Sequence, residues 1–428
     1  MIDAQRWYRR LLGGFLLLSV LPVAQAAEEA PLIDGTSTGP DVTVFSLYDT
    51  QNYGLSNGKR GYSIGTRSCN IGTAPLNWCD NAGGCGAGTT PQEHPVIAQN
   101  MYRLKDGRFN QIGASWLKHG FLSTNSNTAA CGTGSCQTPP LGSDQLGVGC
   151  TDPYGSSLNG SRPLGRKSEV NAATGVFPFP YGGGGASSES WNQRVAVAQD
   201  DLVAASNPGA RYFIEGHYIA SDDAAAGNGL NNASWREVTV SQSTFNLTLS
   251  GSTVREQVAI QAWPTIDPTV ELVNVDVPGT DPVERYHVAR KVTEVSPGLW
   301  HYEYAVHNMN SDRAADLMTV TFFGATNFSG IGFSDVDAHS NEPYDTTDWP
   351  ATTSANSIEW AAPPFPSSPS DANALRWATM YNFWFDADRP PSEIGMHDLG
   401  MFSGLVSEVS FLENSDVLLE DGFETLVP

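Results

Sequence analysis

Short apolar or alternating runs, separated by stretches rich in Gly, Ser and Asn, make up most of the chain. Hardly any segment repeats its apolar residues with the helical period of about 3.6 residues, so the pattern predicts antiparallel strands. Before residue 264 the clearest runs are DVTVFSLYD, HPVIAQNMYRL, FNQIGASWLKHGF, ARYFIEGHYIA, WREVTVSQSTFNLTLSG and EQVAIQAW. After residue 283 they are RYHVARKVTEV, LWHYEYAVHN, LMTVTFFG, SIEWAA and ALRWATMYNFWFDA. Helices are expected only as short segments around residues 191–205 and 221–226.

This pattern predicts an all-β fold of two antiparallel β-sandwich domains. The first is loop-rich and disulfide-stapled, and the second resembles an immunoglobulin or fibronectin sandwich. Four prolines between residues 264 and 282 interrupt the strand runs. The expected organisation is a signal peptide at 1–26, a flexible leader at 27–40, a first β domain at 41–264, a Pro-rich linker at 265–282, a second β-sandwich at 283–412 and an acidic tail at 413–428.

Two hairpins can be placed in register from their turns. Asp106-Gly107 is typical of a type I′ turn, and the numbers of residues paired across that hairpin then add up to 213. Pro297-Gly298 predicts a type II turn, with pairs that add up to 595.

In the second hairpin, alternate apolar residues share one face, which we assign to the core: Trp300, Tyr302, Tyr304 and Val306. The opposite face carries His301, Glu303 and His307. The register of 595 places His287 on the aromatic face and His301 opposite Glu294. We interpret these histidines as structural.

The first 26 residues are typical of a cleaved secretory signal peptide. Arg6, Arg9 and Arg10 precede an apolar run at 11–21, and Ala24-Gln25-Ala26 matches a cleavage site. No later stretch reaches the roughly 18 apolar residues that a membrane-spanning helix needs. The sequence therefore predicts a secreted or periplasmic protein without membrane insertion.

The net charge of the chain limits the classes of partner that it is expected to bind. Lys and Arg number 23 against 46 Asp and Glu, which gives a net charge of −23 and argues against nucleic acid as a partner. An extracellular glycan or protein remains as a partner class.

All six cysteines lie between residues 69 and 150. An even number in a secreted chain favours disulfides over thiols, and no C-x-x-C pair suggests zinc. Short spacing favours Cys79 with Cys85 and Cys131 with Cys136, which leaves Cys69 with Cys150. Spacing alone leaves other connectivities open.

Several segments resemble an uncharacterised family of secreted bacterial all-β proteins: EHPVIAQNMYRLKDGRFNQIGASWLKHGF, LGVGCTDPYGSSLNG, RKSEVNAATGVFP and LRWATMYNFWFDAD. The resemblance covers roughly residues 40–400 and implies an extracytoplasmic location, with no activity, cofactor or catalytic residue attached. The tail LEDGFE is similar to the DGFE-type endings of some gammaproteobacterial secreted proteins.

The sharpest chemical signal is a pair of histidines. His94 and His119 add up to 213, so the first hairpin predicts that they lie opposite each other, close enough to share a zinc or copper ion. A third ligand could come from Glu93, or from His217, with Glu215 on the same strand face. The alternative is a bulge that breaks the register and leaves ordinary half-buried histidines.

An acidic loop offers a possible calcium site at Asp335 and Asp337, continuing to Glu342, Asp345 and Asp348. Clustered carboxylates suit Ca²⁺, although the turn glycine and closing glutamate of a calcium loop are missing. A solvated loop is the alternative. The oxygen-rich segment at 221–232 is a second candidate for calcium, or a helix cap.

No complete catalytic set is visible, and the activity stays undetermined. The G-x-S-x-G match at residues 61–65 lacks the strand–turn–helix context of a hydrolase elbow. The sharpest hypothesis is a zinc- or copper-binding metalloprotein, an enzyme among the options, with its site in the first domain. The alternative is a non-catalytic surface or envelope protein that binds glycan or protein and uses calcium as a structural brace.

Overall fold

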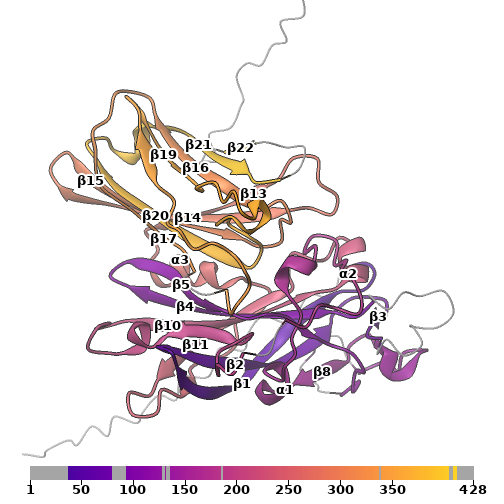
Figure 1. Cartoon of the computed structure of the whole chain (residues 1–428). Helices are drawn as coiled ribbons and strands as arrows, with labels where there is room; N and C mark the ends of the chain where they lie inside the picture. The colour runs from indigo at the N-terminus through magenta and orange to yellow at the C-terminus, as the bar shows by residue number, and fades with distance from the viewer. Residues whose placement is uncertain are drawn as a thin grey trace, which may run out of the picture. The chain divides into compact units, whose positions relative to one another are not determined.

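The structure is a computed structural model and describes residues 37–79, 93–127, 131, 135–184, 187–336, 339–403 and 408–411. Within these ranges the fold is all-β and its named sheets are antiparallel, as predicted (Figure 1). The predicted signal peptide, most of the leader and the acidic tail lie outside the described residues. No helix in the described part of the chain is long and apolar enough to cross a membrane.

The first half of the chain contributes two large sheets. Sheet I, as far as described, has four strands, with β2 between β1 and β8 and also paired with β9: β1 (Val42–Ser56), β2 (Lys59–Asn70), β8 (Thr151–Tyr154) and β9 (Val195–Ala198). Sheet II has the order β12-β11-β10-β4-β5, with β6 also on β4: β4 (Val96–Lys105), β5 (Arg108–Ala114), β6 (Lys118–His119), β10 (Arg211–Ile219), β11 (Ala233–Val240) and β12 (Leu247–Leu249). A small ladder joins β3 (Leu76–Asn77) to β7 (Gln145–Leu146).

The second half contributes two more sheets. Sheet III has the order β13-β14-β15-β20-β17: β13 (Val270–Asp276), β14 (Arg285–Ser296), β15 (Leu299–Asn308), β17 (Phe328–Ser334) and β20 (Thr379–Ala387). Sheet IV has the order β18-β19-β16-β21-β22: β16 (Ala315–Phe322), β18 (Ala351–Thr353), β19 (Ser357–Ala361), β21 (Ile394–Met401) and β22 (Glu408–Phe411). Strand β13 lies inside the segment predicted as a linker.

Helices are short. The α-helices of the described residues are α1 (Ser156–Asn159), α2 (Ser221–Ala225) and α3 (Ala262–Ile266). The 3₁₀ segments are η2 (Gly142–Asp144), η3 (Lys167–Glu169), η4 (Gln199–Leu202), η5 (Ala259–Gln261), η6 (Pro369–Asp371) and η7 (Pro391–Glu393). The helix predicted around 221–226 is confirmed as α2. In the segment predicted around 191–205, only the 3₁₀ turn η4 is helical, and β9 occupies the residues before it.

An apolar core lies between each pair of neighbouring sheets. The four sheets therefore stack in the order I, II, III, IV. One core lies between sheets I and II, and another between sheets III and IV. The third lies between sheets II and III, where Phe213 from β10 packs in one cluster with Ala305 and Met380 from β15 and β20. We call this contact the seam. Sheet II is therefore covered on both faces, which explains its many buried residues (Figure 1).

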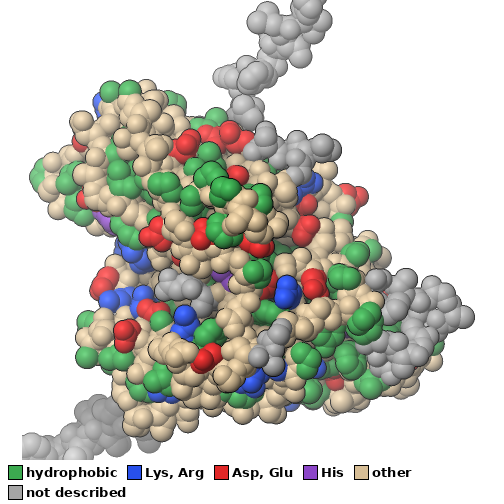
Figure 2. All heavy atoms as spheres, in the orientation of Figure 1, with side chains coloured by type: hydrophobic (Ala, Val, Ile, Leu, Met, Phe, Trp, Pro, Cys, Tyr) green, Lys and Arg blue, Asp and Glu red, His purple; other side chains and the backbone are tan. Residues whose placement is uncertain are grey.

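Polar groups also cross the seam. The Gln111 side chain on β5 accepts a hydrogen bond from the backbone N–H of Met380 and donates one to the carbonyl of Ala378. Arg108 forms a two-pronged ion pair with Glu303 and lies 3.5 Å from the centre of the Trp384 ring. On the face of the molecule drawn in Figure 2, acidic and basic side chains are interspersed.

Each predicted hairpin register holds near its turn and then slips. In the first, pairs such as Tyr102 with Gln111 add up to 213, and an irregularity after Met101 changes the sum to 214. In the second, only Ser296 with Leu299 adds up to 595, and every pair beyond the irregularity at Val295 adds up to 594.

This slip in the second hairpin corrects two side-chain positions. His287 pairs with His307 rather than lying on the aromatic face, and His301 lies opposite Thr293 rather than Glu294. The face assignment on β15 itself is confirmed, because Tyr302, Tyr304 and Val306 lie in the core between sheets III and IV, with Trp300 packed against it.

The disulfides correct the predicted pairing. Cys69 bonds to Cys131, and Cys136 bonds to Cys150, so the predicted pairs Cys131–Cys136 and Cys69–Cys150 are wrong. The predicted partner of Cys79, Cys85, lies outside the described residues.

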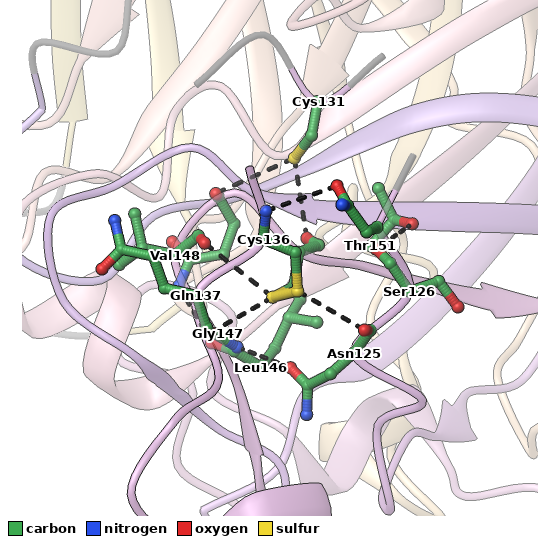
Figure 3. The surroundings of a disulfide bond; sticks show 12 residues. Asn125, Ser126, Cys131, Cys136, Gln137, Leu146, Gly147, Val148 and Thr151 are labelled. Carbon is green, nitrogen blue, oxygen red and sulfur yellow. Dashed lines mark hydrogen bonds between the residues drawn. A yellow bond between two sulfur atoms is a disulfide. The ribbon is translucent and has the colours of Figure 1, made fainter. Parts of the chain in front are cut away.

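The surroundings of the Cys136–Cys150 bridge show how the chain arrives at this pairing (Figure 3). The backbone N–H of Gln137 donates to the carbonyl of Val148, which brings the two segments together. A Cβ atom on Gly147 would lie 1.9 Å from the Gln137 carbonyl oxygen, so only glycine fits there. Spatial neighbourhood, rather than short sequence spacing, selects the partners.

Candidate functional site

The predicted histidine pair meets in the structure. Nε2 of His94 lies 2.8 Å from Nδ1 of His119, so one ring donates a hydrogen bond to the other. Both side chains are buried. The pairing differs from the prediction, because His119 in β6 lies opposite Val96. Two register shifts separate this pair from the turn, and the rings still meet because His94 lies just ahead of β4.

Aromatic rings enclose the pair. Tyr181 stacks on His119 with 3.8 Å between ring centroids, and Phe177 meets both imidazoles edge-on. Two further rings contact His94 edge-on, those of Phe121 and Phe179. The surroundings are therefore apolar, with the imidazole–imidazole hydrogen bond at their centre.

Gly165 gives His119 its space. A Cβ atom at this position would lie 2.4 Å from Nε2 of His119, so a larger residue would displace the ring. Burial, followed by the nearby His94 and Lys118, lowers the pKa of His119 to about 2. The His119 ring is thus neutral at physiological pH, a state in which it can share a proton with His94 or ligate a metal ion.

The structure does not bring His217 to this pair. His217 on β10 lies opposite Ala98 and contacts the ring of Trp377. Strand β4 lies between β10 and β6. The backbones of His217 and His119 are therefore at least two strand spacings apart, which is about 10 Å.

The other predicted ligands are also engaged elsewhere. The Glu93 carboxylate accepts a hydrogen bond from Asn77, and the Glu215 carboxylate accepts three, from Asn100, Tyr102 and the backbone of Ala259. Among the described residues, no group of three or more His, Cys, Asp or Glu side chains is placed to hold a metal ion.

The structure does not show the predicted calcium ligands as one group. Asp335 is buried and accepts a hydrogen bond from Asn373, while Asp337 lies outside the described residues. Asp345 is held by Thr347.

In the segment at 221–232, the carboxylates bind protein N–H groups. The Asp223 side chain accepts from the backbone of Val42 and from Asn232, and Asp222 accepts from the backbone of Asn77. These two residues therefore fasten α2 to neighbouring segments.

A second group of histidines lies at the seam. His217 comes from sheet II, whereas His287 and His307 are paired on sheet III with ring centroids 5.9 Å apart. All three are buried. Both ring nitrogens of His217 and of His307 lack a hydrogen-bond partner among the described residues. Burial lowers the pKa of His217 and of His287 to about 3.

A pocket of about 340 Å³ is lined by residues from both halves of the chain, among them Trp377, whose ring contacts His217. We call it the seam pocket. Its titratable and aromatic lining consists of Lys167, Asp312, His339, Glu342, Tyr344, Asp371, Arg376 and Trp377. Hydroxyl groups of Ser115, Ser168, Ser311, Ser370 and Thr379 add to this lining. Its size falls within the range of small-ligand sites.

Lys167, at the start of η3, is a buried residue in the wall of the seam pocket. Its Nζ atom lies 3.5 Å from Oδ1 of Asn100 and 5.7 Å from the centre of the Trp377 ring. Burial lowers the pKa of Lys167 to about 8, against the opposing pull of Glu342 and Glu215. An amine in this state gives up a proton more readily than an ordinary lysine.

Glu342 lies beside Lys167. Its Oε1 atom accepts a hydrogen bond of 2.6 Å from the backbone N–H of Lys167, and burial raises the pKa of its carboxyl. The carboxyl is therefore more easily protonated than a surface glutamate. Burial thus brings the proton affinities of Lys167 and Glu342 closer together.

Other lining residues of the seam pocket are cationic and aromatic. The Arg376 guanidinium lies 3.8 Å from the centre of the Tyr344 ring and donates to the carbonyls of Ser370 and Ala372. His339 meets the Tyr344 ring edge-on, and burial, with Lys167 and Arg376 nearby, lowers its pKa to about 3. The His339 imidazole is therefore neutral at physiological pH.

The sequence alone does not predict the seam pocket. It places Glu342 in a possible calcium loop, and none of its motifs points to Lys167 or Arg376. These residues come together only because sheets II and III stack, and no local motif reports that contact. Ser63 of the G-x-S-x-G match lies within β2 and donates to the Ser156 carbonyl, which fits its rejection as a nucleophile.

Comparison with known proteins gives no guide to the chemistry: no protein-family model matches this chain, and no curated protein matches its sequence.

Proposed function

We propose that this chain is an extracytoplasmic protein that binds a small hydroxyl-rich ligand, such as a sugar unit of a glycan, in the seam pocket. The observation that carries the proposal is the lining of that pocket. Carboxylates, a guanidinium and several hydroxyls surround a space bounded by Tyr344 and Trp377. Such groups match the hydroxyls and the apolar ring face of a sugar.

The extracytoplasmic location is supported by two disulfides, Cys69–Cys131 and Cys136–Cys150, which persist in oxidising compartments. The predicted signal peptide at 1–26 gives the export route. Zinc or copper binding at His94 and His119, and calcium at Asp335, stay predictions of the sequence.

A panel of neutral and acidic mono- and oligosaccharides, screened by thermal unfolding, tests the proposal. A ligand at 100 times its Kd stabilises the folded state by about 2.7 kcal/mol, a readily measured shift in Tm. We expect at least one saccharide to stabilise the wild type and to lose its effect in Glu342→Gln and in Asp312→Asn.

Glu237→Gln provides the matched control, because Glu237 lies on β11 and does not line the seam pocket. The control should respond like the wild type. A panel without any stabilising member, or a shift that survives both pocket variants, would refute the proposal.

A second candidate function is acid–base catalysis in the same pocket. It is favoured by the buried pair of Lys167 and Glu342, because shifted pKa values in a cleft are typical of proton-transfer sites. Incubation of the wild type and of Lys167→Met with the saccharide that binds, followed by product analysis, distinguishes the two. Turnover by the wild type alone indicates an enzyme, and binding without turnover indicates a binding protein.

A further inference from the structure

A second pocket, of about 700 Å³, lies in the first half of the chain. It shares no lining residue with the seam pocket. Strand β1 contributes Gln51 and Tyr53, and the turn that precedes β9 contributes Asn192, Gln193 and Arg194. The remaining lining comes from the segment at 157–163 and from Gly184 and Ser187. We call it the arginine pocket.

Arg194 is fixed in the wall of this pocket. Its guanidinium lies 3.4 Å from the centre of the Tyr53 ring, its Nε donates to the Gly160 carbonyl, and its Nη1 donates to the Ser190 carbonyl. Burial and the positive charge of Arg162 both lower the pKa of Arg194. The guanidinium is therefore preorganised, and it lies near a second cation.

Arg162 supplies that second cation. Its Nη1 donates to the carbonyls of Ser187 and Glu189. Among the described residues, neither Arg162 nor Arg194 forms an ion pair with a carboxylate, and no Asp or Glu lines the pocket. In a chain with a net charge of −23, a pocket with two cations and no carboxylate is a strong local exception.

Asn192 also belongs to the wall of the arginine pocket. Only 1% of this residue is exposed, and its Oδ1 atom accepts a hydrogen bond from Asn341. Its carboxamide is therefore held within the wall, and the donors that a ligand can reach come from other lining residues.

We propose that the arginine pocket binds an oxyanion group, a carboxylate or a sulfate, on a hydroxyl-bearing molecule such as an acidic saccharide. Two guanidinium groups offer planar donors that match such oxygens, and their mutual repulsion is relieved when an anion lies between them. The side chains of Gln51, Ser157 and Ser161 provide partners for neighbouring hydroxyls. This site is independent of the function proposed for the seam pocket.

Isothermal titration of the full mature chain with glucuronate, inorganic sulfate and glucose tests the proposal. Arg162→Gln removes one exposed cation and leaves Arg194 packed on Tyr53. Arg194→Lys keeps the charge and removes the planar donor pair. The control is Arg211→Gln, an arginine on β10 that pairs with Glu237 outside the pocket.

We expect glucuronate or sulfate to bind the wild type and the control, with affinity that falls as salt is added. Each pocket variant should weaken binding at least tenfold, while thermal unfolding confirms that Arg162→Gln is folded. Tighter binding of glucuronate identifies a carboxylate source, and tighter binding of sulfate a sulfated one. The proposal is overturned if glucose binds as well as both anions, or if Arg162→Gln binds them as the wild type does.

Discussion

The two groups of buried histidines differ in the hydrogen bonding of their ring nitrogens. His94 and His119 satisfy each other through a 2.8 Å hydrogen bond inside a cage of aromatic rings. At the seam, His307 stacks beside His287, and both of its ring nitrogens lack a partner among the described residues. In both groups, burial lowers the pKa of an imidazole far below its ordinary value.

This comparison distinguishes a buried imidazole that is hydrogen-bonded from one that is only packed. A buried imidazole that is hydrogen-bonded recovers part of its desolvation cost, whereas one that is only packed does not. The His94–His119 contact is therefore a specific interaction whose removal is costly. At the seam, His287 makes a hydrogen bond of 2.8 Å with Asn274, whereas His217 and His307 are only packed between sheets II and III. An apolar side chain of similar shape should therefore serve as well in place of His307.

The largest effect is expected from breaking the histidine pair. His119→Leu removes the partner of the His94 Nε2 atom and the stacking on Tyr181, so the free energy of unfolding should fall by about 2 kcal/mol. The matched variant His307→Leu removes two unsatisfied nitrogens and should leave stability unchanged or raise it. Urea unfolding measures both. Equal losses in the two variants would contradict the distinction between pairing and packing.

The sequence predicted the parts of this comparison that depend on local geometry. The Asp106-Gly107 turn fixes the first hairpin correctly as far as Tyr102 with Gln111, and period-2 alternation assigns Tyr302 and Tyr304 to the correct core. The irregularities after Met101 and at Val295 have no local signature, and each one moves every pair beyond it.

The rest depends on contacts between distant segments. Alternation places Glu303 and His307 on the face of β15 opposite the aromatic core, and that face is buried against sheet II. Alternation predicts that a strand has two faces, and it cannot tell whether a second sheet covers the polar one. The seam pocket and the Cys69–Cys131 bridge were missed for the same reason, because their members are brought together only by the folded chain.

A further effect should appear in the dependence of stability on pH. The pKa of His307 is lowered well below 6.5 in the folded state, so below about pH 6.5 the unfolded chain binds the proton and the folded chain does not. The His307 contribution to stability therefore falls as the pH falls, by at most about 1.4 kcal/mol per pH unit.

Buried carboxylates act in the opposite direction. Burial raises the pKa of Asp152 and of Asp222 to about 6, so acidification favours the folded state through these groups. Both carboxylates are present in the wild type and in His307→Leu. Their contribution therefore cancels when the free energies of unfolding of the two proteins are subtracted. Between pH 7 and pH 5 we expect the variant to gain stability relative to the wild type in urea unfolding. A constant difference over that range would show that His307 is not kept neutral by burial.

The smallest effect is expected in the metal content of the purified protein. Zinc or copper at His94 and His119 has to replace their hydrogen bond, and no third ligand stands ready among the described residues. Two imidazoles without a third protein ligand fall short of the three that a catalytic zinc site uses. Elemental analysis of the purified protein, beside His119→Leu and His307→Leu, should find little metal in any of the three. About one zinc or copper per wild-type chain, retained in His307→Leu and lost in His119→Leu, would instead establish the pair as a metal centre. That result would require a ligand that reaches the pair from outside the described residues, or a displacement of the His94 ring that opens the 2.8 Å contact.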